Sequence, residues 1–477
     1  MRLVDARRRL PIVDSLPTPR RTRTLGEDWS PRDPTPRLAV WEITLACDQA
    51  CIHCGSRAGA ARPDELDTDE CLDLVAQLAE IGVGEVVLVG GESYLRNDFV
   101  LIVRAIHDAG MTCTITTGGR TLTRTRAEAM VEAGVSAVNV SIDGLEAAHD
   151  RLRGTPGSWR AAFRALAHLR AAGAKVSVNT QINRLTRHDL VPLLHRLADA
   201  GVRAWQLQLT APFGNAGDHP EILLQPYMLP ALFEELERVA DAADARGVML
   251  WPANNLGYFG PLEARLRRHQ KRGAHYKGCG AGRYALGIEA NGAIKGCPSL
   301  GGTANVGGTV REHSLRQIWH HAQELRYTRE RTAHELWGFC RTCYYADVCR
   351  AGCTATAEPL LGRPGNNPLC LHRAQTLAQQ GLRERIELVQ RGPGQPFDHG
   401  LYRVITEPLD PAERAARGPT HVEEPRTSRL VDPMGPGRPL SPSTRAPSAE
   451  RLRSGRPIEA SAISPKPATP AHHEPWP

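Results

Sequence analysis

The chain has 477 residues, with 59 basic and 52 acidic side chains and a formal net charge of +7, most of which lies in the first 37 and the last 70 residues. The remaining body is close to neutral, which argues against a specific nucleic-acid reader, because such proteins carry a basic surface on the fold itself. No stretch approaches the roughly 18 apolar residues of a membrane-spanning helix, and no apolar signal segment follows the N-terminus, so we expect a cytoplasmic protein without membrane contact.

Both ends of the chain have the composition of disordered segments. Residues 1–36 are rich in arginine, and residues 396–477 are rich in Pro, Arg and Ser, with fifteen of the 36 prolines between Pro408 and Pro477. Such segments bury too little apolar surface to offset the entropy lost on ordering. We therefore expect a disordered basic arm over 1–36 and a disordered tail over 396–477.

Between residues 37 and 250, short apolar runs alternate with segments of helical periodicity. The expected strands are 39–45, 85–89, 112–117, 137–142, 175–181 and 204–209, and the expected helices are 68–81, 99–109, 125–133, 158–172, 190–200 and 230–246. Several of these helices are followed by glycine, a common C-terminal stop. Six successive βα units predict an α/β fold with a parallel sheet, either open and doubly wound or a barrel that lacks two units.

Three cysteines, Cys47, Cys51 and Cys54, directly follow the first expected strand in a C-x3-C-x2-C spacing. Three thiolates can hold three irons of a [4Fe–4S] cluster and leave the fourth iron open, whereas clusters used for electron transfer usually have four cysteine ligands. The alternative is a structural zinc site, which requires four protein ligands. The spacing favours the cluster.

This cysteine spacing after a first strand resembles the radical S-adenosylmethionine (SAM) enzymes. The resemblance implies a partial (β/α)6 TIM-like barrel over 37–250, with Cys47, Cys51 and Cys54 as ligands of a [4Fe–4S] cluster whose open iron binds SAM. Members of the family cleave SAM reductively to a 5′-deoxyadenosyl radical that abstracts hydrogen from a substrate. His53 lies where the family often packs an aromatic residue near the adenine, and a tolerated loop residue is the alternative.

Six further residues lie at ends of successive strands and match the SAM-binding segments of the family: Gly90, Gly91, Glu92, Ser141, Arg153 and Asn179. The resemblance implies that the glycines allow close backbone approach to SAM and that Glu92 accepts hydrogen bonds from the SAM ammonium. It also implies that Arg153 pairs with the SAM carboxylate. For each polar residue taken alone, formation of a turn or a cap is the alternative. No protein side chain is assigned a catalytic role.

Seven cysteines follow within 92 residues: Cys279, Cys297, Cys340, Cys343, Cys349, Cys353 and Cys370. Their intervals resemble the SPASM extension of radical SAM enzymes, which implies two auxiliary [4Fe–4S] clusters in a domain over 251–395. By position, the first cluster takes Cys279, Cys297 and Cys353, and the second takes the other four. The fourth iron of the first cluster is then open or is closed by His275. Two zinc sites are the alternative.

The resemblance to SPASM enzymes predicts a radical SAM oxidoreductase or maturase that acts on a ribosomally made peptide or a protein side chain. A tetrapyrrole (haem-type) side chain is the alternative substrate, and a non-catalytic zinc-stabilised binding protein is the alternative of a different class. Because about 36 residues before the barrel are too few for a folded leader-binding domain, a separate leader-peptide-binding protein is a possible partner. An external electron donor such as flavodoxin or ferredoxin is expected.

Overall fold

The fold is built on one mixed sheet in which the first seven strands run parallel. A computed structural model describes residues 34–268, 276 and 278–425. Within these residues, the central sheet has ten strands in the order β10-β9-β8-β1-β2-β3-β4-β5-β6-β7. Neighbours from β1 to β7 follow chain order without a reversal. This order excludes the doubly wound alternative, in which the strand order reverses at a switch point, and it agrees with an incomplete barrel.

The expected strands form where the apolar alternation predicts them, with shifts of a few residues at some ends. The seven strands are β1 (Leu38–Glu42), β2 (Glu85–Val89), β3 (Thr112–Thr117), β4 (Val135–Ser141), β5 (Lys175–Ile182), β6 (Ala204–Leu209) and β7 (Met249–Pro252). The largest shift is at β1, expected to reach residue 45 but ending at Glu42, where the backbone turns into the cysteine loop. β7 was not expected, because four residues give too short a periodic signal.

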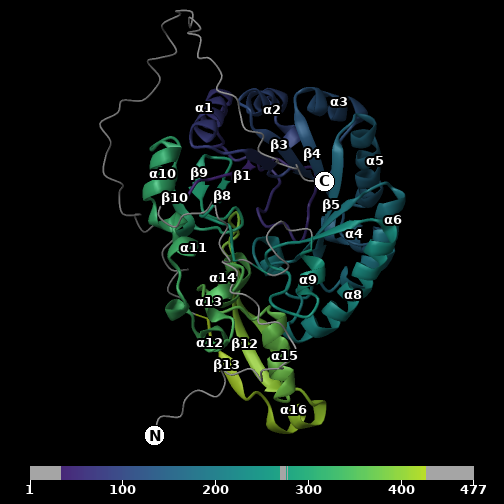
Figure 1. Ribbon diagram of the computed structural model, residues 1–477, viewed down its shortest axis with the longest axis vertical. Helices are drawn as coiled ribbons and strands as arrows, with labels where there is room; N and C mark the ends of the chain where they lie inside the picture. Colours follow the sequence, from purple (N-terminus) through teal and green to yellow (C-terminus); the bar gives the residue numbers. More distant parts are fainter. Residues whose placement is uncertain (1–33, 269–275, 277, 426–477) are drawn as a thin grey trace, which may run out of the picture.

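Helices cover the outer side of this sheet and form an arc around the strands (Figure 1). They are α1 (Thr68–Glu80), α2 (Phe99–Asp108), α3 (Arg124–Glu132), α5 (Ser158–Ala171), α6 (Leu190–Asp199) and α8 (Leu229–Arg246). Two shorter helices, α4 (Glu146–Arg153) and α7 (Asn215–Asp218), contact the cysteine loop instead. Alternate strand residues, such as Val138 and Val140 of β4, pack with the helices in one hydrophobic core. The intervening residues therefore face the inner side of the sheet, since side chains alternate along a strand.

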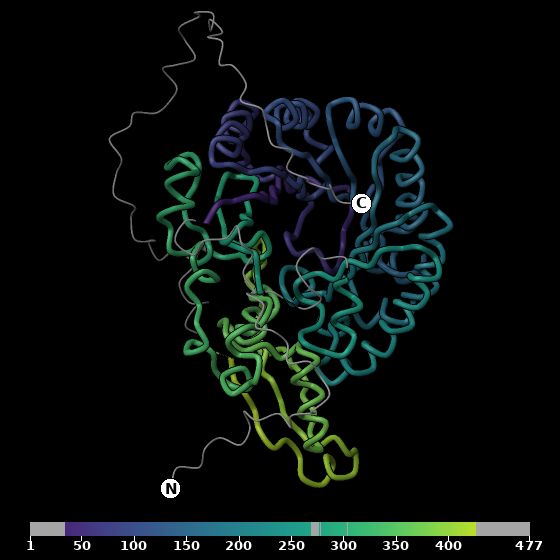
Figure 2. The backbone as a smooth tube through the Cα atoms, in the orientation of Figure 1, coloured from purple at the N-terminus to yellow at the C-terminus, as the bar shows by residue number. Residues whose placement is uncertain are grey.

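The cysteine-rich second half begins by adding three strands to the same sheet. β8 (Ala285–Ile288) pairs parallel with β1, and β9 (Ala293–Lys295) and β10 (Val306–Thr309) follow antiparallel. Short helices then carry the remaining cysteines down one side of the molecule (Figure 2). Of these, α12 (Gly338–Arg341) and α13 (Ala346–Cys349) contain a cysteine, and α14 (Thr354–Leu361) and α15 (Leu371–Gln379) each begin directly after one. Two helices without cysteine, α10 (Leu315–His321) and α11 (Tyr327–Glu330), come between β10 and α12, and α9 (Glu263–Leu266) precedes β8.

The expectation of a disordered tail from residue 396 is wrong over 396–425. β11 (Leu382–Gln390), β12 (Leu401–Pro408) and β13 (His421–Glu423) form an antiparallel sheet, with α16 (Pro411–Arg417) between the last two strands. β12 is almost entirely buried, and α14 and α15 pack near this sheet. The apolar residues of β12 therefore offset the ordering entropy that the proline content suggested would dominate. Residues 426–477 and 1–33 lie outside the described part of the chain.

Candidate functional site

The loop that carries Cys47, Cys51 and Cys54 follows β1 and is held by backbone contacts from distant segments. The amide of Ile52 donates to the Leu152 carbonyl over 2.9 Å, at the end of α4. Asn215 donates from its side chain to the carbonyl of Cys51 and from its backbone to the carbonyl of Cys54, each over 2.9 Å. The loop is thus fixed from two sides before any metal binds.

The three thiols of this loop lie close enough to influence one another. Burial is the main cause that raises the pKa of Cys47 to about 12. The neighbouring Cys51 and Cys54 make smaller contributions in the same direction. Burial and the nearby Cys54 raise the pKa of Cys51 to about 11, although Arg153 opposes this shift. Three clustered thiols, of which Cys51 is buried and Cys47 and Cys54 are half-buried, are stable as thiolates when a cation binds them, which is the arrangement of a metal or cluster site.

Gly90 and Gly91 allow two backbone segments to pack closely against each other. A Cβ atom on Gly90 would lie 2.2 Å from the Thr44 carbonyl oxygen, and one on Gly91 would lie 2.2 Å from that of Ala46. Backbone amides of Gly91 and Glu92 donate to these same two carbonyls over 2.8 and 2.7 Å. The glycines therefore let the segment after β2 pack directly against the start of the cysteine loop.

Glu92 is buried at the centre of a hydrogen-bond cluster at the ends of β2 and β3. Thr117 Oγ1 lies 2.8 Å from both carboxylate oxygens, and the amides of Gly118 and Gly119 each donate to Oε2 over 3.0 Å. Burial raises the pKa of Glu92 to about 7, although these hydrogen bonds oppose the shift. Oε1 accepts a hydrogen bond from Thr117, and each carboxylate oxygen can accept about two hydrogen bonds.

Ser141 and Asn179 are brought together on the inner side of the sheet. They are register neighbours in β4 and β5, and Ser141 Oγ donates to Asn179 Oδ1 over 2.9 Å. The Ser141 hydroxyl therefore orients the Asn179 amide, whose NH2 group is left to donate. The structure places this pair one strand away from the Glu92 cluster, as the shared strand-end register predicts.

Arg153 ends α4 and points back into the sheet. Its Nη2 donates to Asp143 Oδ2 over 2.6 Å, and its Nη1 lies 3.9 Å from the Cys51 sulfur. Its Nε is buried and has no hydrogen-bond partner among the described residues. The arginine thus connects the end of β4 to the cysteine loop and retains one donor.

Asp143 is the functional residue that the sequence argument passed over. Burial alone would raise its pKa, but Arg153 and His53 outweigh burial and hold the pKa of Asp143 well below its usual range. His53 Nε2 lies 3.2 Å from Asp143 Oδ2, and His53 Nδ1 lies 3.2 Å from the Leu152 carbonyl. His53 therefore ties the cysteine loop to β4 and α4 through both ring nitrogens. The Ser-Ile-Asp-Gly segment was the signal that could have identified Asp143.

Amide side chains line the inner side of the sheet next to these residues. Asn139 donates from Nδ2 to Gln206 Oε1 over 3.2 Å. Asn139 Oδ1 and Gln181 Oε1 are buried and accept no hydrogen bond within the described part of the chain. The sequence did not identify these polar residues, because the alternation of side chains along a strand does not show which face of the sheet would bind a substrate.

Four of the later cysteines surround one cavity. A space of about 320 Å³ is lined by aromatic and small residues together with Cys340, Cys343, Cys349 and Cys370. Burial raises the pKa of Cys370 to about 12, with Cys340 and Cys343 contributing. The four thiols expected for the second auxiliary cluster are therefore the ones that the fold brings to a common, mainly apolar cavity.

The other three later cysteines form a separate group. Burial raises the pKa of Cys279 to about 12, and Cys353 and Cys297 are the next contributors. The Cys353 amide donates to the hydroxyl of Tyr258 over 3.0 Å, at the start of α14. This grouping agrees with the expected division between two auxiliary clusters. His275, the expected alternative ligand, lies outside the described residues.

The spacing of these thiols differs from that of a site for one ion. Among the described residues, no three His, Cys, Asp or Glu side chains converge tightly enough to hold one metal ion. A cubane cluster places its ligands at separate iron corners, so wider spacing suits it better than zinc. The two remaining cysteines, Cys71 and Cys113, are fully buried in the hydrophobic core and belong to neither group.

A segment before β12 crosses the cysteine loop. Asp398 accepts a hydrogen bond from Arg57 Nε over 2.7 Å, and the Phe397 amide donates to the Gly55 carbonyl over 3.0 Å. The Gly214 amide donates to the Asp398 carbonyl over 2.6 Å. This strap, residues 391–400, therefore fastens the segment before β12 to the cysteine loop and to the segment after β6.

No helix in the described part of the chain is both long and apolar enough to cross a membrane.

Comparison with known proteins agrees with this arrangement. Residues 41–213 match the radical SAM superfamily, and residues 279–344 match an iron–sulfur cluster-binding domain, SPASM. An AdoMet-dependent heme synthase of Methanosarcina barkeri is 30% identical over 71% of this chain and 97% of the relative. A mycofactocin maturase, MftC, of Mycobacterium ulcerans is 31% identical over 72% of this chain and 91% of the relative.

Solved structures show the same fold at lower identity. Streptococcus suis SuiB bound to S-adenosylmethionine matches with a TM-score of 0.53 and 18% identity, over 67% of this chain and 73% of that chain. Native anSMEcpe with bound AdoMet matches with a TM-score of 0.58 and 13% identity, over 72% and 95%. The chain is therefore an iron–sulfur enzyme of the radical SAM superfamily, with a SAM-binding [4Fe–4S] cluster in its barrel and a SPASM domain that binds auxiliary clusters.

Proposed function

We propose that Cys47, Cys51 and Cys54 hold the SAM-binding cluster in a core domain over 37–250. The clustering of these three thiols on one loop held by distant segments supports this proposal. The SPASM part over 251–395 then holds two auxiliary clusters, one on Cys279, Cys297 and Cys353 and one on the four cysteines that share a cavity. When bound, the core cluster supplies the electron that cleaves SAM to methionine and a 5′-deoxyadenosyl radical.

In this proposal the protein binds and orients SAM through the strand-end residues. The Glu92 carboxylate suits the SAM ammonium, and the unpartnered Nε of Arg153 suits its carboxylate. Ser141 and Asn179 contribute polar contacts on the same side of the sheet. Gly90 and Gly91 hold the cysteine loop against β2 and so fix the distance between the thiols and Glu92.

We infer that the substrate is a ribosomally made peptide or a protein side chain. The observation that carries this inference is the pair of buried amide oxygens, Asn139 Oδ1 and Gln181 Oε1, which lack donors among the described residues. Peptide N–H groups are donors that would satisfy both oxygens, and an unsatisfied buried acceptor costs about 1–3 kcal/mol. The relative named mycofactocin maturase and the SuiB structure bound to its precursor peptide support a peptide substrate.

The proposal is tested with anaerobically reconstituted enzyme, SAM and dithionite. The wild type should form 5′-deoxyadenosine, and Cys54→Ala should lose this product completely, whereas Cys343→Ala should retain some SAM cleavage. A candidate precursor peptide encoded near the gene should be modified by the wild type and left unmodified by Cys343→Ala. Wild-type protein that contains zinc without iron and forms no 5′-deoxyadenosine would contradict the proposal and favour a binding protein.

A tetrapyrrole side chain is the second candidate substrate, favoured by the relatives named AdoMet-dependent heme synthase. Modification of an iron porphyrin and no peptide product in the same assay would support it. We also propose an external electron donor of the flavodoxin or ferredoxin class, since the core cluster must be reduced. A separate leader-peptide-binding protein remains part of the peptide proposal.

A further inference from the structure

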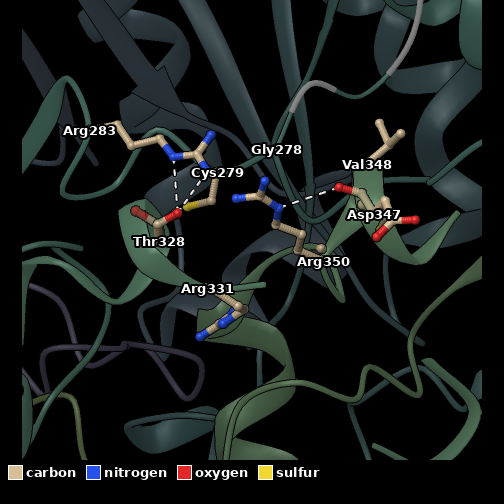
Figure 3. Close-up of a pocket in the computed structure, with 10 residues that line it drawn as sticks. Gly278, Cys279, Arg283, Thr328, Arg331, Asp347, Val348 and Arg350 are labelled. Atoms are coloured by element: carbon tan, nitrogen blue, oxygen red, sulfur yellow. Dashed lines mark hydrogen bonds between the residues drawn. The ribbon is translucent and has the colours of Figure 1, made fainter. Parts of the chain in front are cut away.

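The SPASM part contains a cleft whose walls are rich in arginine. It is lined by residues from three segments: Gly278, Cys279, Arg283, Thr328, Arg331, Asp347, Val348, Cys349, Arg350 and Gly352. Figure 3 shows the guanidinium groups of Arg283 and Arg350 near Cys279, with Arg331 on another wall. Three arginines against one aspartate give the cleft an excess of positive charge.

Arg331 is buried without an acidic partner in the described part of the chain. It is 6% exposed, and its Nη1 donates to Thr354 Oγ1 over 2.9 Å. Three other deeply buried arginines bind a carboxylate at 2.6–2.7 Å, in the pairs Arg153–Asp143, Arg267–Glu263 and Arg373–Glu384. A buried cation without a counter-charge is costly, so the cleft is suited to an anion from outside the chain.

Arg350 reaches into the cleft from an unusual backbone. Arg350 and Ala351 have φ values of +52° and +64°, a left-handed conformation that residues with a Cβ rarely adopt. The side chain of Arg350 is held loosely, by one long contact of 3.4 Å from Nε to the Asp347 carbonyl. The like charge of Arg350 also contributes, after burial, to a lowered pKa of Arg283, which shows that the two guanidinium groups lie near each other. An anion between them would relieve this repulsion.

We propose that this cleft binds a carboxylate group of the substrate beside Cys279. The inference rests on the proposed function and adds to it the chemical class that the second half of the protein recognises. Guanidinium groups bind carboxylates with paired, charge-assisted hydrogen bonds, which makes arginine the suitable residue. Since Cys279 is a proposed ligand of the first auxiliary cluster, the bound carboxylate would lie beside a cysteine that holds this cluster.

The depth of the cleft favours a small carboxylate over an acidic protein surface. Arg283 and Arg331 are 7% and 6% exposed, so a slender group can reach them whereas the surface of a folded partner cannot. Two substrates present such a group: a peptide, at its C-terminus or on an acidic side chain, and a tetrapyrrole, on its propionates. The shared chemistry is the carboxylate, and the binding experiment separates the two sources.

The experiment measures binding to the anaerobic, cluster-loaded full chain by equilibrium dialysis, with two matched pairs of probes. One pair is a short peptide with a free C-terminal carboxylate and its C-terminal amide; the other is an iron porphyrin with propionate groups and its methyl ester. We expect one acid probe to bind at least about ten-fold more tightly than its blocked form, because one charge-assisted contact is worth that factor or more. The pair that shows the difference identifies the source.

Variants then assign the effect to the cleft. Arg350→Gln should weaken the acid probe about ten-fold or more, and Arg350→Lys should restore part of the affinity, since it keeps the charge without the planar fork. Arg316→Gln is the matched control, because Arg316 is exposed, outside the cleft, and paired with Glu80. Iron content and the visible absorption spectrum show that each variant is folded and loaded.

Three results would overturn the inference. Equal binding of acid and blocked probes would exclude a carboxylate site. If Arg350→Gln leaves the affinity unchanged but shifts the reduction potential of the auxiliary clusters, the arginines balance the charge of the clusters and do not bind a carboxylate. Unchanged affinity with slower reduction by flavodoxin would assign them to docking of an electron donor. If the wild type itself forms no 5′-deoxyadenosine with dithionite, the proposed function fails instead.

Discussion

The guanidinium of Arg153 donates to the carboxylate of Asp143 over 2.6 Å at a site where both side chains are almost fully buried. Asp143 lies two residues after β4 and Arg153 ends α4, so their contact joins the two ends of the connection between the strand and the helix. The same arginine approaches the Cys51 sulfur, and the same aspartate contacts His53. This ion pair therefore contributes both to the packing of one βα unit and to the position of the cysteine loop.

Arg153→Leu should destabilise the protein by about 3–5 kcal/mol, because it leaves the Asp143 carboxylate buried without its partner. Urea unfolding of cluster-loaded, anaerobic protein, followed by circular dichroism, measures the change in free energy. Arg124→Leu is the control: its pair with Glu128 is exposed, and we expect a loss below about 1 kcal/mol. Similar losses of unfolding free energy in both variants would show that the buried pair contributes no more to stability than the exposed pair.

The strap over 391–400 gives a prediction about cluster retention. Asp398→Ala removes the partner of Arg57 Nε and the acceptor for the amides of Gly394 and Gln395. We expect the cysteine loop to open more often and iron to be lost to a chelator several-fold faster than in the wild type. Glu413→Ala in the exposed helix α16 should leave the rate unchanged. Equal rates for Asp398→Ala and the wild type would mean that the strap does not stabilise the loop.

Much of the core was predictable because its periodic signals are local. The strands β2, β3 and β6 form over the expected residues, since alternating apolar positions and the glycines after each helix act over a few residues. The cysteines were identified by their intervals alone. Their division into two groups came from the resemblance, and the cavity shared by Cys340 and Cys370 adds a physical reason for it.

The missed features depend on contacts between distant segments. Asp143 looks like a turn residue in the sequence, and its role appears once His53 and Arg153 approach it from a loop and a helix. The strap lies in a Gly- and Pro-rich stretch typical of linkers, whereas its function depends on Arg57, more than 300 residues earlier. β12 had a usable signal, because its run of Leu, Tyr, Val and Ile residues is apolar and β-branched.

Single cysteine variants should divide the iron content by cluster. Cys353→Ser and Cys370→Ser should each lower the iron content of the reconstituted protein by up to about four irons out of about twelve, because each belongs to a different auxiliary group. Iron and sulfide analysis of anaerobic protein measures this loss. Cys71→Ser is the matched control, as this thiol is equally buried and lies in the hydrophobic core. A loss of iron in Cys71→Ser that matches the others would contradict the assignment.

Glu42 predicts a dependence of stability on pH. It ends β1, is almost fully buried, and neither carboxylate oxygen has a side-chain or backbone hydrogen bond that meets the usual geometry. The charged groups that face it are Lys295, Glu289 and Arg62. Burial raises its pKa from 4.5 to about 8, although Lys295 opposes the shift. The carboxyl therefore stays protonated in the folded chain over a pH range in which it ionises in the unfolded chain.

The sign of the effect follows from this difference. Between about pH 4.5 and pH 8 the folded state binds the extra proton, so stability falls as pH rises, by at most about 1.4 kcal/mol per pH unit. Glu42→Gln removes the titration, and its stability relative to the wild type should increase across this window and level off above pH 8. Urea unfolding of both proteins at matched pH values measures the difference. A difference that stays constant from pH 5 to pH 8.5 would show that Glu42 has an ordinary pKa.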